Sequence, residues 1–481
     1  MTPARQRLIL AFLLLFGFCA RAATFKSPLL DHHSWRQADT AAIARNFARE
    51  QFNILYPQVD WRGDRPVGYV ESGLEPLAFA VAALAKITGR FHPEIGRLAN
   101  CFLFLGSAAL IWTFIRRRYD GATGLVAVYL YALGFPLVLY IERSFMNEAL
   151  LICLSLLCLV AAQSWLMSSG RRWGWLLMLL VASSLIAAIK LPYLIIWAPV
   201  AGLFFEKNGW RAWRRWELWL GAALSLGVAL AWYRHAHALG QLSGLSFGLS
   251  DKLFDAELMF TGKYPMKVLV RLVKDILGPV GFVAAGVGFW MALRSRRWCE
   301  LLGCGAFLAY LMVIVGGNFQ HDYYQLAFMP IAPAVAAPAL VALARIAPGH
   351  PLFRHRETWL AALLVLAAFA TFVRSTSFHS WYEYGADSVL FCDSADSFAA
   401  PQDRVVFIGN NDPALLFCMD RKGWLLTEED SSEARVRSIW KAGAKLAIVP
   451  GAPVRDEVWQ LLKTDGQLVF TAGRIVVYRL P

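Results

Sequence analysis

Long apolar runs recur along most of this 481-residue chain, and they restrict its fold more than any other feature. A helix that crosses a bilayer needs about 20 mostly apolar residues, and we count about eleven such runs. They lie at about 8–24, 95–115, 122–141, 147–167, 174–190, 191–205, 217–233, 277–293, 299–316, 324–344 and 358–373. With 58% hydrophobic and 17% charged residues, the chain is too apolar for a soluble protein of this size. The sequence therefore predicts a polytopic α-helical membrane protein.

Arginine clusters between alternate pairs of runs predict the orientation. They occur near residues 5–7, 116–118, 171–172, 211–215, 294–297 and 345–356. Because basic loops stay in the cytoplasm, the N-terminus is expected there, and the segments at about 25–94, 234–276 and 374–481 are expected outside. This explains the net charge of +13 without nucleic-acid binding. The first run also has features of a cleavable signal peptide, but an uncleaved first helix gives the basic loops a consistent sidedness.

We expect two domains. Residues 1–374 would form the transmembrane domain, with a large first outer loop at 25–94, and residues 375–481 a periplasmic soluble α/β domain. In the tail, apolar segments predict strands at 405–409 and 445–450, a helix at 454–464 and a closing hairpin over 466–480. The tail also holds Cys392 and Cys418, which an oxidising compartment would pair as a disulfide.

The first outer loop is too long for a connector, and long ordered loops tend to be functional. Its apolar periodicity predicts one surface helix from Ser34 to about Glu50, opened by a capping box between Ser34 and Gln37. A second helix is predicted from about Leu74 to Thr88. This loop is therefore the first place to look for a site.

Two aspartates in this loop are candidates for a general base. On the first surface helix Arg36 and Asp39 lie three residues apart on one face. An ordinary surface ion pair is the alternative interpretation. Asp31 lies closer to the first membrane exit, where it could also be an interfacial cap. A carboxylate there can accept a proton from an acceptor hydroxyl, while basic groups stabilise a departing phosphate.

Further polar residues are candidates for substrate binding. In the first loop these are His33, Trp35, Arg36, Gln37, Glu71 and Glu75, and at the outer ends of later runs they are Arg143, Lys190, His321, Tyr323 and Tyr324. Each later group could be a solvated turn, and Glu71 and Glu75 could simply start a helix. Their convergence on one side is what a headgroup site requires. His32, His33 and His321 could bind a metal, but they lack metal-ligand spacing, so we assign no metal site and leave dependence on a divalent metal open.

Several of these segments resemble membrane-embedded GT-C glycosyltransferases, especially the bacterial relatives of glycosyltransferase family 39, which include protein O-mannosyltransferases and the lipid A aminoarabinose transferase. The resemblance covers about residues 1–375 and rests on His33–Ala41 with Ile43–Phe47, Asn53–Pro57, Gly68–Glu71, Glu75–Leu77 and His321–Leu326. The better-known relatives have an Asp-Glu pair where alignment on Ile43–Arg45 places Arg36 and Gln37. Asp39 and Asp31 therefore both remain candidates.

The resemblance implies a polyprenyl-phosphate-linked sugar donor, a catalytic carboxylate in the first outer loop, and inversion at the anomeric carbon. Asp39 or Asp31 would be the base, and Arg36, Arg143, Lys190 or His321 would contact the phosphate or sugar. The leading hypothesis is a glycosyltransferase of a bacterial inner membrane with a periplasmic active site, no soluble cofactor, and a lipid, glycan or protein acceptor. A lipid-linked sugar flippase or other transporter is the alternative, although its polar groups should lie at mid-membrane depth. A glycan-binding assembly subunit is a third hypothesis.

Overall fold

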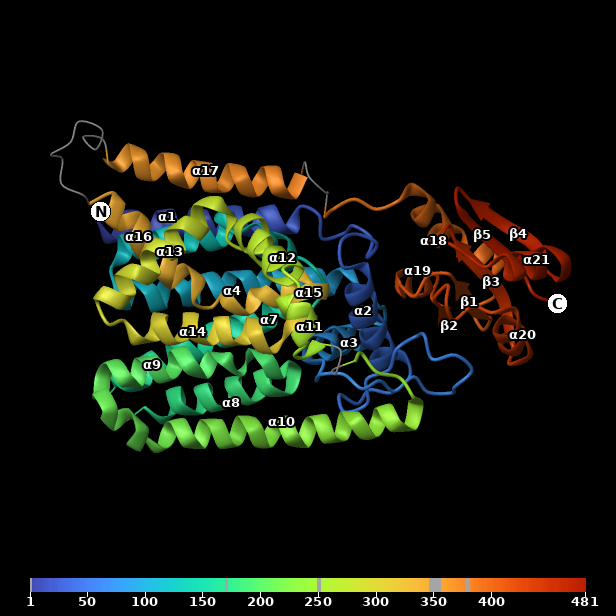
Figure 1. The fold of residues 1–481 in the computed structure, drawn as a ribbon, viewed down its shortest axis with the longest axis horizontal. Coiled ribbons are helices and arrows are strands. Elements are labelled where there is room, and N and C mark those ends of the chain that lie inside the picture. Colours follow the sequence, from blue (N-terminus) through green and yellow to red (C-terminus); the bar gives the residue numbers. More distant parts are fainter. Residues whose placement is uncertain (1, 169–171, 249–251, 346–355, 377–380) are drawn as a thin grey trace. The chain divides into compact units, whose positions relative to one another are not determined.

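The computed structural model describes residues 2–168, 172–248, 252–345, 356–376 and 381–481. The chain divides into two compact units, and Figure 1 labels their helices and strands. The helix-bundle unit comprises Met1–Phe25, Arg97–Arg234 and Gly248–His379. The loop–sheet unit comprises Lys26–Gly96, His235–Phe247 and Ser380–Pro481. The segment Lys26–Gly96 and the C-terminal tail, which are far apart in sequence, thus belong to one unit.

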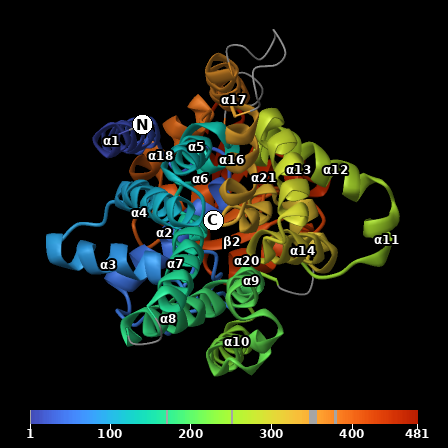
Figure 2. The same cartoon turned by 90° about the vertical axis from the view of Figure 1, so that its left-hand side faces the viewer.

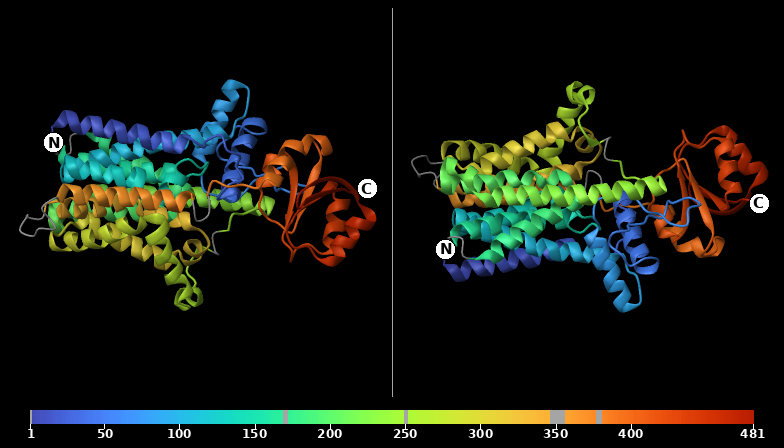
Figure 3. Two further views of the ribbon diagram at one scale, coloured as in Figure 1. Left: turned by 90° about the horizontal axis from the view of Figure 1, so that it is seen from above. Right: turned by 90° about the horizontal axis from the view of Figure 1, so that it is seen from below.

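The longer helices of the helix-bundle unit run side by side, as Figures 1 and 3 show, and Figure 2 views them nearly end-on. The helices of this unit are α1 (Pro3–Ala22), α4 (Glu94–Arg118), α5 (Gly121–Tyr129), α6 (Pro136–Ile141), α7 (Glu148–Met167), α8 (Trp173–Ile189), α9 (Trp197–Asn208), α10 (Trp216–Ser243), α11 (Ala256–Phe260), α12 (Lys263–Arg271), α13 (Gly278–Arg294), α14 (Trp298–Val313), α15 (Val315–Gln320), α16 (Ala332–Leu343) and α17 (Arg356–Thr376). Short segments of 3₁₀ or π geometry lie between some of them: η1 (Leu130–Gly134), η2 (Leu191–Ile196), η3 (Gly209–Arg214), η5 (Leu272–Ile276) and η6 (Asp322–Phe328). The last residues of α10, from His235 onward, belong to the loop–sheet unit.

By length and composition, four of the described helices can cross a membrane: Pro3–Ala22, Glu94–Arg118, Glu148–Met167 and Glu357–Ser375. Two bent helix pairs raise that number to six if each pair is one span; they bend by 108° between Ile276 and Gly278 and by 67° between Phe328 and Ala332. The apolar helices agree with a polytopic membrane protein. The count of eleven spans is not confirmed, because several predicted runs are bent or form helices shorter than a bilayer is thick.

Small residues let neighbouring helices of the bundle approach closely. A Cβ atom added to Gly288 of α13 would lie 1.9 Å from the backbone oxygen of Val335 in α16. A Cβ atom on Gly202 of α9 would lie 2.5 Å from the backbone of Cys299 in α14. Membrane helices pack through such contacts, since lipid provides no hydrophobic force between them.

The loop–sheet unit contains both predicted surface helices, α2 (Ser34–Arg49) and α3 (Pro76–Thr88). The predicted capping box of α2 is wrong. The residue before the helix is His33, which has a left-handed backbone (φ 60°) and makes no side-chain cap. The Ser34 hydroxyl instead donates to Asp412, and the Gln37 amide donates to Asp31. Tertiary partners have replaced the local hydrogen bonds that a capping box would make.

The tail folds around a five-stranded sheet with the strand order β2-β1-β3-β5-β4. The strands are β1 (Arg404–Ile408), β2 (Lys422–Leu426), β3 (Ala444–Pro450), β4 (Gln467–Ala472) and β5 (Ile475–Arg479), and β1 runs parallel to both β2 and β3. The helices are α18 (Ala386–Phe398), α19 (Ala414–Cys418), α20 (Glu433–Lys441) and α21 (Asp456–Asp465). The predicted strands β1 and β3, the helix α21 and the closing β4–β5 hairpin are confirmed. β2 was not predicted.

Helices cover both faces of this sheet. Phe391 and Phe398 of α18 belong to the core on one face, while Val436 of α20 and Leu462 of α21 belong to the core on the other. The predicted disulfide between Cys392 and Cys418 is present, and its Cα atoms are 5.5 Å apart. It ties α18 to α19, so both helices are held over the same face of the sheet.

The first loop covers the outer edge of β2, the last strand on that side of the sheet. The backbone N–H of Gly423 donates to the Asp60 carbonyl (3.1 Å), and that of Gly63 donates to the Gly423 carbonyl (2.8 Å). Gly63 has a φ of 66°, and a Cβ atom there would lie 2.9 Å from the Trp424 indole nitrogen. A glycine is therefore needed at this contact, which satisfies an edge strand that would otherwise be open.

Candidate functional site

Helix α2 is buried on almost every side, because all residues from Gln37 to Phe47 are buried. Five of them, Gln37, Asp39, Thr40, Arg45 and Asn46, carry polar side chains that need hydrogen-bond partners away from water. Such a helix is not a solvated surface helix. Its polar residues define the first part of the candidate site.

Asp39 is held by two tryptophans. The indole N–H of Trp61 donates to Oδ1 at 2.8 Å, and that of Trp35 donates to Oδ2 at 2.9 Å. Burial raises the pKa of this carboxyl to about 7, although the two indoles and Arg36 favour its charged form. A carboxylate with a pKa near neutrality can exchange a proton at working pH, as a general base must. The alternative of an ordinary exposed Arg36–Asp39 ion pair does not apply, because Arg36 pairs elsewhere.

Arg36 pairs with Glu75 instead. Its Nη2 donates to Glu75 Oε1 at 2.9 Å, and its guanidinium lies 5.0 Å from the centre of the Phe247 ring. The Glu75 side chain is fully buried, whereas Arg36 is about one quarter exposed at 25%. Glu75 is therefore an anchor for a basic group that still reaches solvent. It also stands at the N-cap position of α3, where its side chain makes no capping hydrogen bond.

Asp31 is buried close to the start of α2. Its Oδ1 accepts from the Gln37 amide at 2.8 Å, and the same amide nitrogen donates to the His32 carbonyl at 2.9 Å. The rings of His32 and His33 are tilted by 40° relative to each other, with centroids 3.8 Å apart. A left-handed backbone is strained for histidine, and such strain is often found at functional sites.

Glu71 lies at the edge of the same unit and is part-exposed. Its carboxylate is 3.2 Å from His237 Nδ1. Its backbone accepts from Phe247 N–H at 3.1 Å and donates to the Leu245 carbonyl at 2.9 Å. These backbone bonds bring Phe247 against Arg36 and Trp61, so Glu71 acts on the Asp39 region through its backbone.

A second set of predicted residues meets in the helix-bundle unit around Lys190. The Lys190 ammonium donates to Glu148 at 2.9 Å and lies 3.9 Å and 4.9 Å from the ring centres of Tyr324 and Tyr323. The His321 ring is stacked on Tyr323 with a centroid separation of 5.1 Å. Aromatic rings attract a cation beside them, so Tyr323 and Tyr324 help to hold the lysine ammonium in place.

The turn between α6 and α7 is pinned from several sides. Glu142 is fully buried and pairs with Arg21 at 2.9 Å, and Tyr131 also donates to it. Asn100 donates to the carbonyls of Ser144 and Met146, the latter at 2.8 Å. The turn also carries Arg143, which is buried and stacks 4.5 Å above Tyr140. This is a rigid buried turn, unlike the solvated turn that we considered.

Arg271 was missed in the sequence analysis. It donates to the carbonyls of Asn318 (2.7 Å) and Phe319 (3.2 Å), directly before the His321 segment. Lys267, one turn earlier on α12, lies 4.0 Å from the Phe319 ring. The sequence contains a pattern that could have identified Arg271 and Lys267. Basic residues recur every three or four positions from Lys263 to Lys274, in a segment expected on the outer side of the membrane.

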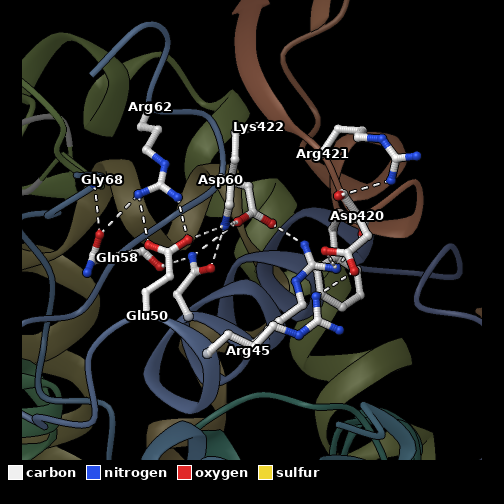
Figure 4. A network of polar contacts seen from close by, with 12 residues as sticks. Arg45, Glu50, Gln58, Asp60, Arg62, Gly68, Asp420, Arg421 and Lys422 are labelled. Carbon is white, nitrogen blue, oxygen red and sulfur yellow. Dashed lines mark hydrogen bonds and ion pairs between the residues drawn. The ribbon is translucent and has the colours of Figure 1, made fainter. Parts of the chain in front are cut away.

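A network of charged side chains surrounds Asp60, the residue before Trp61, and is drawn in Figure 4. Asp60 is buried and accepts from Arg45 (2.5 Å), Asn46 (3.1 Å) and Lys422. Burial acts to raise the pKa of Asp60, but Arg45 and Lys422 outweigh it and lower the pKa to about 2. Lys422 also contacts Glu50 at 3.2 Å. Asp60 is thus charged at neutral pH, whereas the pKa of Asp39 lies near neutrality.

Within either compact unit taken by itself, no three His, Cys, Asp or Glu side chains of the described residues converge closely enough to hold a metal ion. The polar and aromatic groups that each unit brings together are carboxylates, tryptophans and one arginine in the loop–sheet unit, and a lysine with tyrosines in the helix bundle.

No protein-family model matches the sequence, and no curated protein matches it. Solved structures do. ArnT from Cupriavidus metallidurans in the apo state aligns with a TM-score of 0.67 and 14% identity, over 98% of this chain and 97% of that chain. ArnT bound to undecaprenyl phosphate aligns with a TM-score of 0.65 and 14% identity, over 100% and 98%. This chain has the fold of the GT-C glycosyltransferases.

An oligosaccharyltransferase with the same GT-C fold also matches. The Archaeoglobus fulgidus enzyme tethered with an acceptor peptide aligns with a TM-score of 0.57 and 11% identity, over 94% of this chain and 69% of that chain. The expected resemblance to GT-C enzymes is confirmed at the level of fold. At this identity the match assigns no residue a role, so the roles of the predicted site residues remain predictions.

Proposed function

We propose that the chain is an inverting glycosyltransferase that moves a sugar from a polyprenyl-phosphate-linked donor to a lipid, glycan or protein acceptor of the cell envelope. The observation that carries this proposal is the alignment of the whole chain with a GT-C structure that binds undecaprenyl phosphate. The arrangement around Asp39 supports it, since a buried carboxyl with a pKa of about 7 suits a proton acceptor.

In the proposed reaction the acceptor hydroxyl attacks the anomeric carbon from the face opposite the phosphate. Its proton passes to Asp39, and the bond between the sugar and the phosphate oxygen breaks with its electron pair moving to the phosphate. Asp31 is the second candidate for the base, because it too is buried at the start of α2. Catalysis would consist of orientation and charge stabilisation.

Basic side chains would bind the lipid phosphate and the sugar. We propose Arg36, Arg143, Lys190 and His321 for these contacts and add Arg271, which the sequence analysis missed. Trp35 is 44% exposed beside Asp39 and offers an aromatic surface on which a sugar ring can pack. His33, Gln37, Glu71, Glu75, Tyr323 and Tyr324 would shape and support these contacts.

We also propose that the chain spans a bacterial inner membrane with about eleven helices, a cytoplasmic N-terminus and a periplasmic tail at 375–481. The distribution of arginines supports this orientation. The Cys392–Cys418 disulfide supports a periplasmic tail, since such bonds persist in oxidising compartments. Membrane lipids and the lipid-linked donor would then be its natural partners.

Mass spectrometry of envelope glycolipids and glycoproteins tests the proposal. A deletion strain is complemented with wild type, Asp39→Asn, Asp31→Asn, or the matched control Asp64→Asn, whose side chain lies exposed in the same loop. We expect one sugar mass to disappear on deletion and to return with wild type and Asp64→Asn. Asp39→Asn should not restore it and should accumulate the lipid-linked donor. If Asp39→Asn and Asp31→Asn both restore the sugar, neither is the base and a transporter becomes the better explanation.

A further inference from the structure

Trp61, one of the two tryptophans that hold Asp39, is itself held by the C-terminal tail. Its ring packs against the core that includes Phe391 and Leu416. The residues on either side of it, Asp60 and Arg62, are buried. The position of the Asp39 carboxylate therefore depends on groups outside the first loop.

One of these groups is the side chain of Lys422, the first residue of β2. Its ammonium contacts Asp60, Asn46 Oδ1 (2.5 Å) and Glu50 Oε1 (3.2 Å), and its side chain is 27% exposed. Figure 4 shows it between the carboxylates of Asp60 and Glu50. Asp60 directly precedes Trp61 in the sequence. The Lys422–Asp60 ion pair and the backbone hydrogen bonds of Gly423 therefore hold the same short segment in place.

We propose that Lys422 is a positioning residue that acts through Asp60 and Trp61 to hold the Asp39 carboxylate. The tail would thereby take part in catalysis without touching the substrate. This inference rests on the proposed function for its catalytic meaning, since Asp39 is the proposed base. Its physical content, a coupling between Lys422 and Asp39, can be measured without any substrate.

The effect of Lys422 on Asp39 has to be separated from the effects of other charges. Among the described residues, Arg36 on the same helix lowers the pKa of Asp39, and Asp412 just before α19 raises the pKa of Asp39. Asp412 accepts from the Ser34 hydroxyl at 2.6 Å. Lys86 on α3 faces Phe52 and the Ala48 carbonyl instead. Arg36 pairs with Glu75 and Asp412 accepts from Ser34, whereas Lys422 contacts Asp60, so the path from Lys422 through Asp60 and Trp61 is the one to test.

The experiment is labelling of Asp39 in the purified full chain with dicyclohexylcarbodiimide, which reacts with protonated carboxyl groups. Peptide mass spectrometry gives the pH at which labelling falls by half, near 7 for wild type. Trp61→Phe removes one donor to the carboxylate and keeps the ring, so this midpoint should rise by about one unit, or tenfold in proton affinity. Lys422→Met should raise it in the same direction.

The decisive comparison is the double variant. If Lys422 acts through Trp61, then Lys422→Met in the Trp61→Phe background causes no further shift, and the two effects are not additive. Lys422→Arg should stay within a few tenths of a unit of wild type. Lys445→Met, at an exposed lysine on β3, is the matched control and should leave the midpoint unchanged.

Two results would overturn the proposal: a midpoint that Lys422→Met leaves unchanged or lowers, or shifts that simply add in the double variant. Failure of the proposed function looks different. In that case Asp39→Asn still transfers the sugar in cells, while the labelling midpoints report on Lys422 as before. Where Asp39 is the base, Lys422→Met should also lower kcat with little change in KM for the donor.

Discussion

Asp39 gives the first prediction, because burial of its charge should lower the free energy of unfolding of the chain, although the proposed activity requires this carboxylate. Its pKa is about 7 in the folded chain and near 3.8 when exposed to water. The folded state therefore binds the proton more tightly than the unfolded state. The contribution of Asp39 to stability is therefore most favourable at low pH, falls as pH rises from about 4 to about 7, and stays lowered above that.

The size of this effect follows from the shift. About three pKa units correspond to roughly 4 kcal/mol at pH 8, and to roughly 2 kcal/mol at pH 5. In Asp39→Asn the charge is gone. The asparagine oxygen still accepts one indole N–H, but its amide group faces the other as a second donor. An unsatisfied buried donor costs about 1–3 kcal/mol. The variant should thus be about 1–3 kcal/mol more stable than wild type at pH 8 and about equal to it at pH 5.

Thermal unfolding of the purified full chain in detergent at the two pH values measures this. We expect Asp39→Asn to melt roughly 1–3 °C higher than wild type at pH 8 and close to wild type at pH 5. The exposed Asp64→Asn variant should match wild type at both. A variant that melts lower than wild type by the same margin at both pH values would refute the reasoning, because Asp39 would then be a structural carboxylate.

Three further predictions concern the groups around this site. Arg36→Gln should destabilise the chain by about 2–4 kcal/mol, since it leaves Glu75 buried without its cation, and adding Glu75→Gln should recover part of the loss in thermal unfolding. Replacing Cys392 and Cys418 by serine should remove about 3–4 kcal/mol, as expected for a cross-link spanning 26 residues, and reductant should lower the melting temperature of wild type but not of this variant. Because the folded-state pKa of Asp60 is depressed to about 2, its contribution of about 2 kcal/mol is present above pH 4 and lost between pH 4 and pH 2, and an acid titration should show this loss in wild type and not in Asp60→Asn.

Local pattern was sufficient for elements whose burial is regular. The β-branched run Val405–Ile408 and the run Leu446–Val449 identify the central strands, because both faces of those strands are covered by helices. The strand β2 starts with a lysine and a glycine, and this pattern is atypical of a buried strand. Its Gly423 is required by contact, since a Cβ atom there would lie 1.8 Å from the Val405 carbonyl oxygen. Only the neighbouring strand reveals that requirement.

In the candidate site, too, some residues could be identified from local pattern and others only from tertiary contacts. The sequence pointed to Asp39, Asp31 and Arg36 because charged and aromatic groups crowd beside an apolar run. It assigned Ser34 and Gln37 to a local cap, and that was wrong, because stronger partners come from Asp412 and Asp31. A one-dimensional pattern shows which groups are present and cannot show which distant group competes for them.

The amino-acid sequence by itself determined the class of this protein, a membrane protein with an α/β tail, because apolar length and strand periodicity follow from neighbouring residues alone. It also determined which loop holds the candidate carboxylates. Only the tertiary structure decided which aspartate titrates near neutrality and which stays charged. Asp39 and Asp60 differ little in local sequence, but one is buried between two indoles and the other between Arg45 and Lys422. Burial raises the pKa in both, and only cations brought from distant segments can reverse it.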